Sequence, residues 1–322
     1  MKSVVRELLL TSRGRRFAIP GIRLLARAIA PVAALIARAG IGSDACLDRG
    51  FLPIPIHFYQ PIFDHREVPA SVWERQHDLP GIDFREHDQL TLLARLGEFG
   101  GECAWPRAGR PEAGYFWDND TFGYTSACLL HAFVRHRQPM QVVEVGAGMS
   151  TLVFRSALAA NGGGKLISID PYPAPYLSRL GADHTVVDRP VQEVDRAIFE
   201  EADFVFIDSS HVMRTGGDVN TIYLDVLPRL RAGTTVHVHD VHLPFEYPRE
   251  YSRREQSRYF WNEQYVLQAF LVMNHSYRID LAGYWAQTTH PREFSEAFPG
   301  FDPGRHRATS SIYLFRSPAG ES

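Results

Sequence analysis

Short hydrophobic runs recur along the second half of the chain, and several of them end in a carboxylate. Five runs predict buried parallel strands, at residues 141–145, 165–170, 184–187, 203–208 and 234–240. Residues 277–287 and 310–316 are expected to add two final strands, and residues 123–136 to form a helix before the first strand. Strands that alternate with helical segments need right-handed crossovers, so the pattern predicts an α/β fold with a doubly wound sheet.

The first third of the chain has a different pattern. Residues 1–40 are rich in Arg, Leu, Ile and Ala, and they predict helical pieces broken at Pro20 and Pro31. A proline-rich link follows, which should be extended, and then a short stretch with helical spacing. We therefore expect an N-terminal helical and irregular extension at 1–110, followed by the α/β domain at 111–318.

The basic N-terminal stretch also bears on localisation. Arg23, Arg27 and Arg38 interrupt its apolar run, which argues against a signal peptide or a transmembrane span. A helix packed on the body of the protein is the favoured interpretation. The alternative is a basic amphipathic helix in peripheral contact with a membrane through residues 1–40. Because the three cysteines are widely spaced and show no disulfide pattern, we expect a cytoplasmic protein.

Composition narrows the class of partner. The chain has 322 residues, of which 45% are hydrophobic, so it can bury a substantial core. Its net charge of −3 gives no general attraction to nucleic acid. We therefore expect a small-molecule partner and no nucleic acid, and leave the oligomeric state open.

The segment Q-V-V-E-V-G-A-G-M-S-T, residues 141–151, predicts a strand, a glycine turn and a helix. Gly146 and Gly148 permit a close approach of a ligand, and the following helix N-terminus favours an anionic or polar group. A dinucleotide fingerprint needs a third glycine where Thr151 stands, and Glu144 would lie close to a pyrophosphate. A cofactor with a positive charge and no phosphate, such as S-adenosylmethionine, fits better than a nicotinamide dinucleotide.

Polar side chains follow several of the expected strands, at the sheet edge where ligands of open α/β sheets bind. Asp170 ends the second strand, where its carboxylate can accept bonds from both ribose hydroxyls. Gln192 lies in a loop after the third strand that is placed to contact adenine. Asp208 and Asp240 end the fourth and fifth strands.

At these residues the chain resembles the class I S-adenosylmethionine-dependent methyltransferases. The resemblance is carried by E-V-G-A-G-M-S-T, by the strand-end Asp170, by F-I-D-S-S-H at 206–211 and by V-H-V-H-D at 236–240. Bacterial members found near polysaccharide or secondary-metabolite genes share segments similar to residues 115–124 and 260–265. The resemblance implies a Rossmann-like, seven-stranded methyltransferase sheet whose last strand runs antiparallel.

The resemblance also implies a set of cofactor contacts. These are Glu144, Gly146, Gly148, Ser150 and Asp170. We add Gln192, from its position after the third strand, and Asp208, from its position after the fourth, so S-adenosyl-L-methionine is the expected cofactor.

Methylation of a hydroxyl oxygen requires removal of its proton as the new bond forms. His211 and His239 are candidates for that base, and Asp208 stands three residues before His211, where it could orient the imidazole. The alternative for His211 is that it caps or packs the following helix. Asp208 and Asp240 could instead hold Mg²⁺, which would lower the pKa of the acceptor.

Aromatic and polar residues before the first strand and after the fifth are candidates for the acceptor pocket. Tyr115, Trp117 and Asn119 are expected to line it or to pack the core. Tyr247 lies in the segment 245–264, where a lid or an acceptor loop is expected. We therefore predict O-methylation of a sugar or a small metabolite. The alternatives are a S-adenosylmethionine-binding protein without turnover and, less favoured, a nicotinamide-dependent oxidoreductase.

Overall fold

The computed structural model describes residues 12–253 and 259–318, and the chain divides into two compact units, Met1–Val68 and Pro69–Ser322. The division thus lies upstream of the expected boundary at residue 110. The difference concerns residues 69–110, which contain helix α5, Glu86–Leu96. This helix packs against strand β6, Tyr277–Ala282, and against helices α6, Tyr124–Arg137, and α13, Pro291–Ala297, of the second unit.

The first unit contains helix α2, Ser12–Ala39, and the short helix α3, Ser43–Leu47. Helix α2 continues through Pro20 and Pro31, so the predicted breaks are wrong. Most of its other positions are Ala, Leu or Arg, which are strong helix formers and sustain the helix around the two missing amide donors. By length and composition alone, the segment Pro20–Ala39 could cross a membrane.

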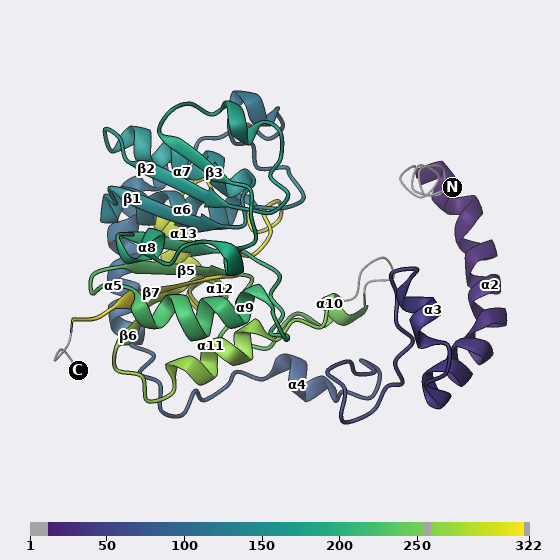
Figure 1. Cartoon of the computed structure of the whole chain (residues 1–322). Helices are drawn as coiled ribbons and strands as arrows, with labels where there is room; N and C mark the ends of the chain where they lie inside the picture. The colour runs from purple at the N-terminus through teal and green to yellow at the C-terminus, as the bar shows by residue number, and fades with distance from the viewer. Residues whose placement is uncertain (1–11, 254–258, 319–322) are drawn as a thin grey trace. The chain divides into compact units, whose positions relative to one another are not determined.

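The second unit is built on one seven-stranded sheet with the strand order β3-β2-β1-β4-β5-β7-β6 (Figure 1). The strands are β1 Gln141–Val145, β2 Lys165–Ile169, β3 His184–Val187, β4 Phe204–Ile207, β5 Thr235–His239, β6 Tyr277–Ala282 and β7 Ser311–Arg316. β7 runs antiparallel to both of its neighbours, and the other pairings are parallel. The predicted doubly wound sheet with an antiparallel last strand is confirmed.

Helices cover both faces of this sheet (Figure 1). The α-helices of the second unit are α4 Ala70–Glu74, α5 Glu86–Leu96, α6 Tyr124–Arg137, α7 Met149–Ala160, α8 Ala197–Glu200, α9 Asp218–Thr221, α10 Arg249–Arg253, α11 Glu263–Leu271, α12 Gly283–Thr289 and α13 Pro291–Ala297. Short 3-10 helices lie at Gly97–Glu102, Pro111–Ala113, Leu177–Arg179, Val191–Glu193 and Leu227–Arg229, and a π-helical turn at Ile222–Val226. Helices α8, α9 and α11 lie on one face, and α5, α6 and α13 on the other (Figure 1).

The sixth strand is shorter than predicted. It ends at Ala282, and helix α12 begins at Gly283, whereas the sequence suggested a strand over 277–287. At Gly283 a Cβ atom would lie 2.8 Å from Leu129 and 3.0 Å from the carbonyl oxygen of Ser311. A larger residue at this point would therefore collide with helix α6 and strand β7. The predicted helix at 123–136 is confirmed as α6.

Candidate active site

The glycine turn after β1 touches the end of the neighbouring strand β4. Gly146 has φ +87°, and a Cβ atom there would lie 1.9 Å from the carbonyl oxygen of Asp208. Only glycine fits at this position, for both reasons. At Gly148 a Cβ atom would meet nothing within 4 Å. Protein packing therefore explains the first glycine, and the open space beside the second is available to a ligand.

Glu144 in β1 stabilises this turn through hydrogen bonds. Its buried carboxylate accepts hydrogen bonds from Ser150 at 2.6 Å, from Thr151 at 2.7 Å and from Ser168. The Thr151 hydroxyl in turn accepts the backbone N–H of Gly148 at 3.0 Å. Glu144 and Ser150, both predicted as cofactor contacts, are thus bonded to each other. Their direct contacts set the conformation of the turn.

Asp170 stands at the end of β2 and faces the same turn. Its carboxylate accepts the backbone N–H of Ala147 at 3.0 Å and that of Tyr172 at 2.7 Å, and it is partly exposed. Each oxygen keeps a lone pair for a further donor, as the predicted ribose contact requires. The side-chain amide of Gln192 donates to the carbonyl of Gly216 at 3.0 Å, and its predicted contact with adenine stays a prediction.

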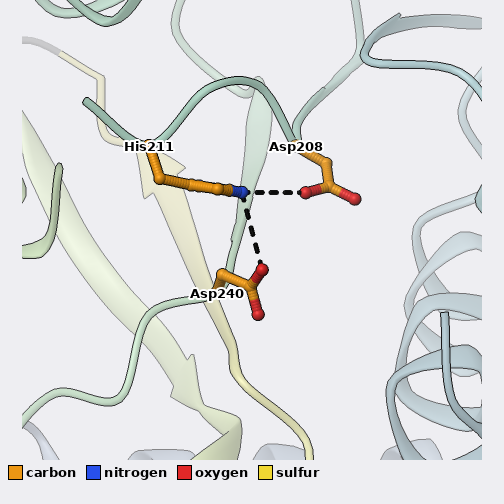
Figure 2. Close-up of side chains that lie close together, drawn as sticks. All are labelled: Asp208, His211 and Asp240. Carbon is orange, nitrogen blue, oxygen red and sulfur yellow. Dashed lines mark ion pairs between the residues drawn. The ribbon is translucent and has the colours of Figure 1, made fainter. Parts of the chain in front are cut away.

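Three predicted residues converge beyond β4 and β5. Figure 2 shows the His211 imidazole pointing its Nε2 atom between two carboxylates, at 3.2 Å from Asp208 and 3.5 Å from Asp240. One ligand atom of each of the three lies within 4.8 Å of the others, as one metal ion requires. His211 has φ 59° and Asp240 has φ 57°. Such left-handed conformations at two residues of one cluster are typical of functional sites.

His239 borders this group without joining it. Its Nδ1 lies 3.5 Å from Asp208 and 3.6 Å from Asp240, and its ring packs against Phe122 at 5.0 Å. As expected for one face of a covered strand, it is buried together with His237. Among the described residues, the set suited to a metal contains His211 and no other histidine.

The start of helix α11 holds the cluster together, and the sequence did not single out its role. The buried Glu263 carboxylate lies 2.8 Å from Nδ1 of His211. The N–H groups of Asn262 and Glu263 donate to the His211 carbonyl. Gln264 accepts the backbone N–H of His242 at 2.7 Å, which binds the loop after β5 to the same helix. In the sequence, Glu263 and Gln264 belong to the F-W-N-E-Q-Y segment at residues 260–265, which is one of the segments that carry the family resemblance.

The charges in this cluster favour a cation between the carboxylates. Burial alone would lower the pKa of His211, but its hydrogen bonds to Asp208 and Glu263 outweigh burial and raise that pKa well above its ordinary value. Burial alone would raise the pKa of Asp208, but His239 and His211 hold it below the usual range. An imidazole with a raised pKa is a poor base near neutral pH, although it supplies the positive charge that the carboxylates require.

Comparison with known proteins assigns the domain. A family model described as a methyltransferase domain matches residues 143–241, which run from β1 to the loop after β5. An uncharacterized protein of Archaeoglobus fulgidus is 30% identical over 160 residues, which cover 45% of this chain and 72% of that protein. This chain belongs to the methyltransferase family. The predicted class I methyltransferase is thereby confirmed at the level of family and fold.

Solved methyltransferases resemble the chain at low identity. The methyltransferase PaMTH1 of Podospora anserina is 14% identical, with a TM-score of 0.35, over 74% of this chain and 98% of that one. The O-methyltransferase TomG of Streptomyces achromogenes is 16% identical, with a TM-score of 0.33, over 76% and 99% of the two chains. The first was solved with S-adenosylhomocysteine bound and the second with S-adenosylmethionine.

The residues predicted for the acceptor pocket of this methyltransferase mostly bond within the protein. The Tyr115 hydroxyl donates to the carbonyl of Phe122 at 2.8 Å, and the Asn119 amide donates to the same carbonyl at 2.9 Å. Trp117 packs edge-on against His306 at 4.8 Å. Tyr115 and Asn119 therefore shape the loop that carries Phe122 to His239. Their predicted contact with the acceptor stays a prediction.

Other aromatic side chains lie closer to the cluster. Trp261 packs 4.4 Å from the His211 ring, and Tyr259 stacks on Trp261 at 4.6 Å. Both are partly exposed, so they offer a wall beside the metal-competent group. Tyr247 is buried, and its hydroxyl accepts the backbone N–H of Gln264 at 2.9 Å. Sequence reasoning chose Tyr247 from the same segment and did not choose Trp261.

Proposed function

We propose that this methyltransferase moves the methyl group of S-adenosylmethionine to a hydroxyl oxygen of a small acceptor such as a sugar. The observation that carries the proposal is the convergence of Asp208, His211 and Asp240 beside the glycine turn. O-methylation needs a way to deprotonate the acceptor hydroxyl, and this cluster has the chemistry for it at the correct edge of the sheet.

The cofactor side of the proposal rests on Gly148 and Asp170. The space beside Gly148 admits a ligand, and the partly exposed Asp170 carboxylate can accept bonds from ribose hydroxyls. S-adenosylmethionine supplies a methyl group on a positively charged sulfur. The chain's residues have to hold and orient it and exclude water, because an in-line displacement depends chiefly on alignment.

The donor set at the cluster fits a divalent cation. Two carboxylates suit Mg²⁺ or Mn²⁺, and the imidazole nitrogen makes Mn²⁺ a second candidate beside the expected Mg²⁺. Glu263 holds Nδ1 of His211, which leaves Nε2 directed at the carboxylates, as a metal-ligating histidine requires. A cation held there would lower the pKa of an acceptor hydroxyl.

Direct deprotonation by His211 is the second candidate mechanism. It is favoured by the same Glu263–His211 contact, which resembles the oriented base of many hydrolases and transferases. The raised pKa of His211 weighs against it near neutral pH, since most of the imidazole would already carry a proton, and a metal ion bound at Nε2 would likewise have to displace that proton. The two mechanisms differ in their requirement for a metal.

The first test is calorimetric titration of the purified full chain with S-adenosylmethionine, S-adenosylhomocysteine and NADH. We expect micromolar binding of the two sulfur compounds and none of NADH. Asp170→Ala should weaken binding by about 1–3 kcal/mol through the lost charge-assisted bonds. Asp183→Ala, at the opposite edge of the sheet, is the matched control and should bind normally. Equal affinity of both variants would remove Asp170 from the site.

The second test separates turnover from binding. The protein is incubated with methyl-labelled S-adenosylmethionine and a panel of sugars and small phenols, before and after chelation, with Mg²⁺ or Mn²⁺ added back. We expect a methyl ether product whose formation stops on chelation and returns with the ion. Cofactor binding without label transfer to any acceptor would favour the alternative of a binding protein. Metal-independent transfer would favour His211 as the base.

A further inference from the structure

Helix α2 has a charge unlike that of the rest of the chain. Its sequence S-R-G-R-R-F-A-I-P-G-I-R-L-L-A-R-A-I-A-P-V-A-A-L-I-A-R-A contains six arginines and neither Asp nor Glu. The whole chain carries a net charge of −3. A helix of this charge in an acidic protein indicates a partner with dense negative charge.

The arginines of α2 lie mainly along one side. Arg23 and Arg27 are four residues apart, and Arg38 follows eleven residues later, which is close to three full turns. All three therefore share a narrow stripe on the helix surface.

The opposite side of α2 is apolar and exposed. Leu25, Ile29 and Val32 follow one another at helical spacing, half a turn away from the arginine stripe. Their exposed fractions are 59%, 50% and 57%. A soluble helix usually buries such residues against a core, so this face requires an occupant.

Exposed apolar side chains are concentrated in the first unit. Among the side chains that the structure describes, 22 large hydrophobic residues are exposed; fifteen of them lie between residues 22 and 63, and the other seven lie in the second unit. The fifteen include Phe51, Phe58 and Tyr59, in the proline-rich link after α3. Tyrosine is enriched at the boundary between lipid and water, and phenylalanine is common on the apolar face of interfacial segments.

We propose that α2 lies in the plane of an anionic lipid surface, with its apolar side in the acyl region and its arginine stripe at the phosphates. The charge argues for lipid over a protein surface, because the arginines gain little when the apolar side packs on protein. It also argues against a span, since Arg23 and Arg27 would then enter the hydrocarbon region. An interfacial helix has a basic polar face and an apolar face, and α2 has both. The proposal goes beyond methyl transfer and does not depend on it.

The test is flotation of the full chain with vesicles of phosphatidylcholine alone or mixed with phosphatidylglycerol. The charge variant is Arg23→Gln, Arg27→Gln and Arg38→Gln together. Its control is Arg231→Gln, Arg292→Gln and Arg305→Gln, which removes three exposed arginines from the second unit and changes the net charge equally. Because each arginine contributes about fivefold to binding of an anionic surface, we expect about a 100-fold loss in the first variant and little change in the control.

A second variant keeps the outcome interpretable. Leu25→Asp with Ile29→Asp should abolish flotation with either vesicle and leave cofactor binding by the second unit unchanged. Vesicle binding that rises with phosphatidylglycerol and falls with salt supports the proposal. Equal loss in both arginine variants would overturn it, as would no flotation of the unaltered chain. Self-association lost in the aspartate variant, or resistance to alkaline extraction as for an integral protein, would also overturn it.

Discussion

Two carboxylates on adjacent strands have pKa values that are shifted in opposite directions. Among the described residues, the hydrogen-bond donors to Glu144 in β1 are hydroxyl groups, and burial raises its pKa to about 7. Asp208 after β4 lies beside two imidazoles, and these hold its pKa below the usual range against the effect of burial. Neutral donors cannot replace the hydration of a buried charge, whereas a cationic partner can.

The comparison extends to the regions around them. In the glycine-turn region, Glu144 to Thr151, the polar side chains form hydrogen bonds with one another. The cluster region, Asp208, His211 and Asp240, brings two carboxylates and one imidazole to a single point. We infer that the first region gives the cofactor site its shape, and that the second has the unbalanced charge on which the chemistry depends.

The largest effect should come from the residue that joins the two regions. Gly146→Ala places a Cβ atom against the Asp208 carbonyl in a backbone conformation that alanine avoids. We expect a loss of about 3–5 kcal/mol in the free energy of unfolding, measured by urea denaturation. Gly148→Ala is the matched control, because its Cβ would meet nothing within 4 Å. It should keep stability and lose cofactor affinity. Equal stability of both variants would refute the close contact.

Substitutions in the cluster region should lower the turnover rate and change the cofactor affinity much less. Asp240→Asn retains the shape of the side chain and its contact with Ser310 while removing one negative charge. We expect about a 10²–10³-fold fall in turnover, because one charged ligand of the proposed cation is lost. The control is Asp183→Asn, an exposed carboxylate at the opposite sheet edge. Full activity of the Asp240 variant would place the cation, or the base, elsewhere.

Glu144 in the glycine-turn region should make the free energy of unfolding depend on pH. The folded-state pKa of Glu144, about 7, lies above the value of about 4.5 expected in the unfolded chain. Stability from this group is therefore fully present below pH 4.5 and is lost as pH rises to about 7, by about 3 kcal/mol. Glu144→Gln lacks this titration. Unfolding free energies at pH 5 and pH 8 should differ more in the unaltered protein than in the variant; an equal difference would contradict the raised pKa.

The sequence predicted the members of both regions, but it did not predict the helix that holds the cluster together. The turn, Asp170 and the strand-end Asp208 and Asp240 are encoded within a few residues of recognisable strands, so local pattern places them. Glu263 comes 52 residues after His211, and nothing local distinguishes a buried carboxylate at a helix start from an exposed one. Folding brings Glu263 and His211 together through hydrogen bonds from backbone N–H groups at the start of α11 to the His211 carbonyl. The hydrophobic pattern of the sequence does not predict such bonds.

The contacts of Asn119 and Trp261 show what these two residues do within the protein, while the predicted contacts with the acceptor stay predictions. Asn119 stands in an aromatic, polar stretch that suggests a binding loop, yet its amide and carbonyl bond to residues 116–122. Trp261 lies in the segment where a lid or acceptor loop is expected, and its ring packs on His211. The residue type alone does not distinguish these two roles. The hydrogen bonds of Asn119 show that it stabilises its own loop, and the ring contact of Trp261 places it beside the cluster.

The smallest expected effect tests whether Glu263 controls the charge of the cluster. Glu263 is a positioning residue, since it contacts His211 and not the reacting atoms in our proposal. Glu263→Gln keeps the side-chain shape and removes one of the carboxylates that raise the pKa of His211. The pKa of His211 should therefore fall, and the low-pH limb of the turnover profile should move to lower pH, because neutral His211 is then available sooner.

A second glutamate–histidine pair supplies the control for this last experiment. Glu102 lies 2.8 Å from Nε2 of the buried His131, the same separation as in the Glu263–His211 pair. Glu102→Gln should leave the pH profile of turnover unchanged, since that pair lies outside the cluster. The His211 pKa can be followed independently by NMR titration of the imidazole. A profile that shifts in both variants would indicate a general loss of stability, and one that shifts in neither would separate Glu263 from the chemistry.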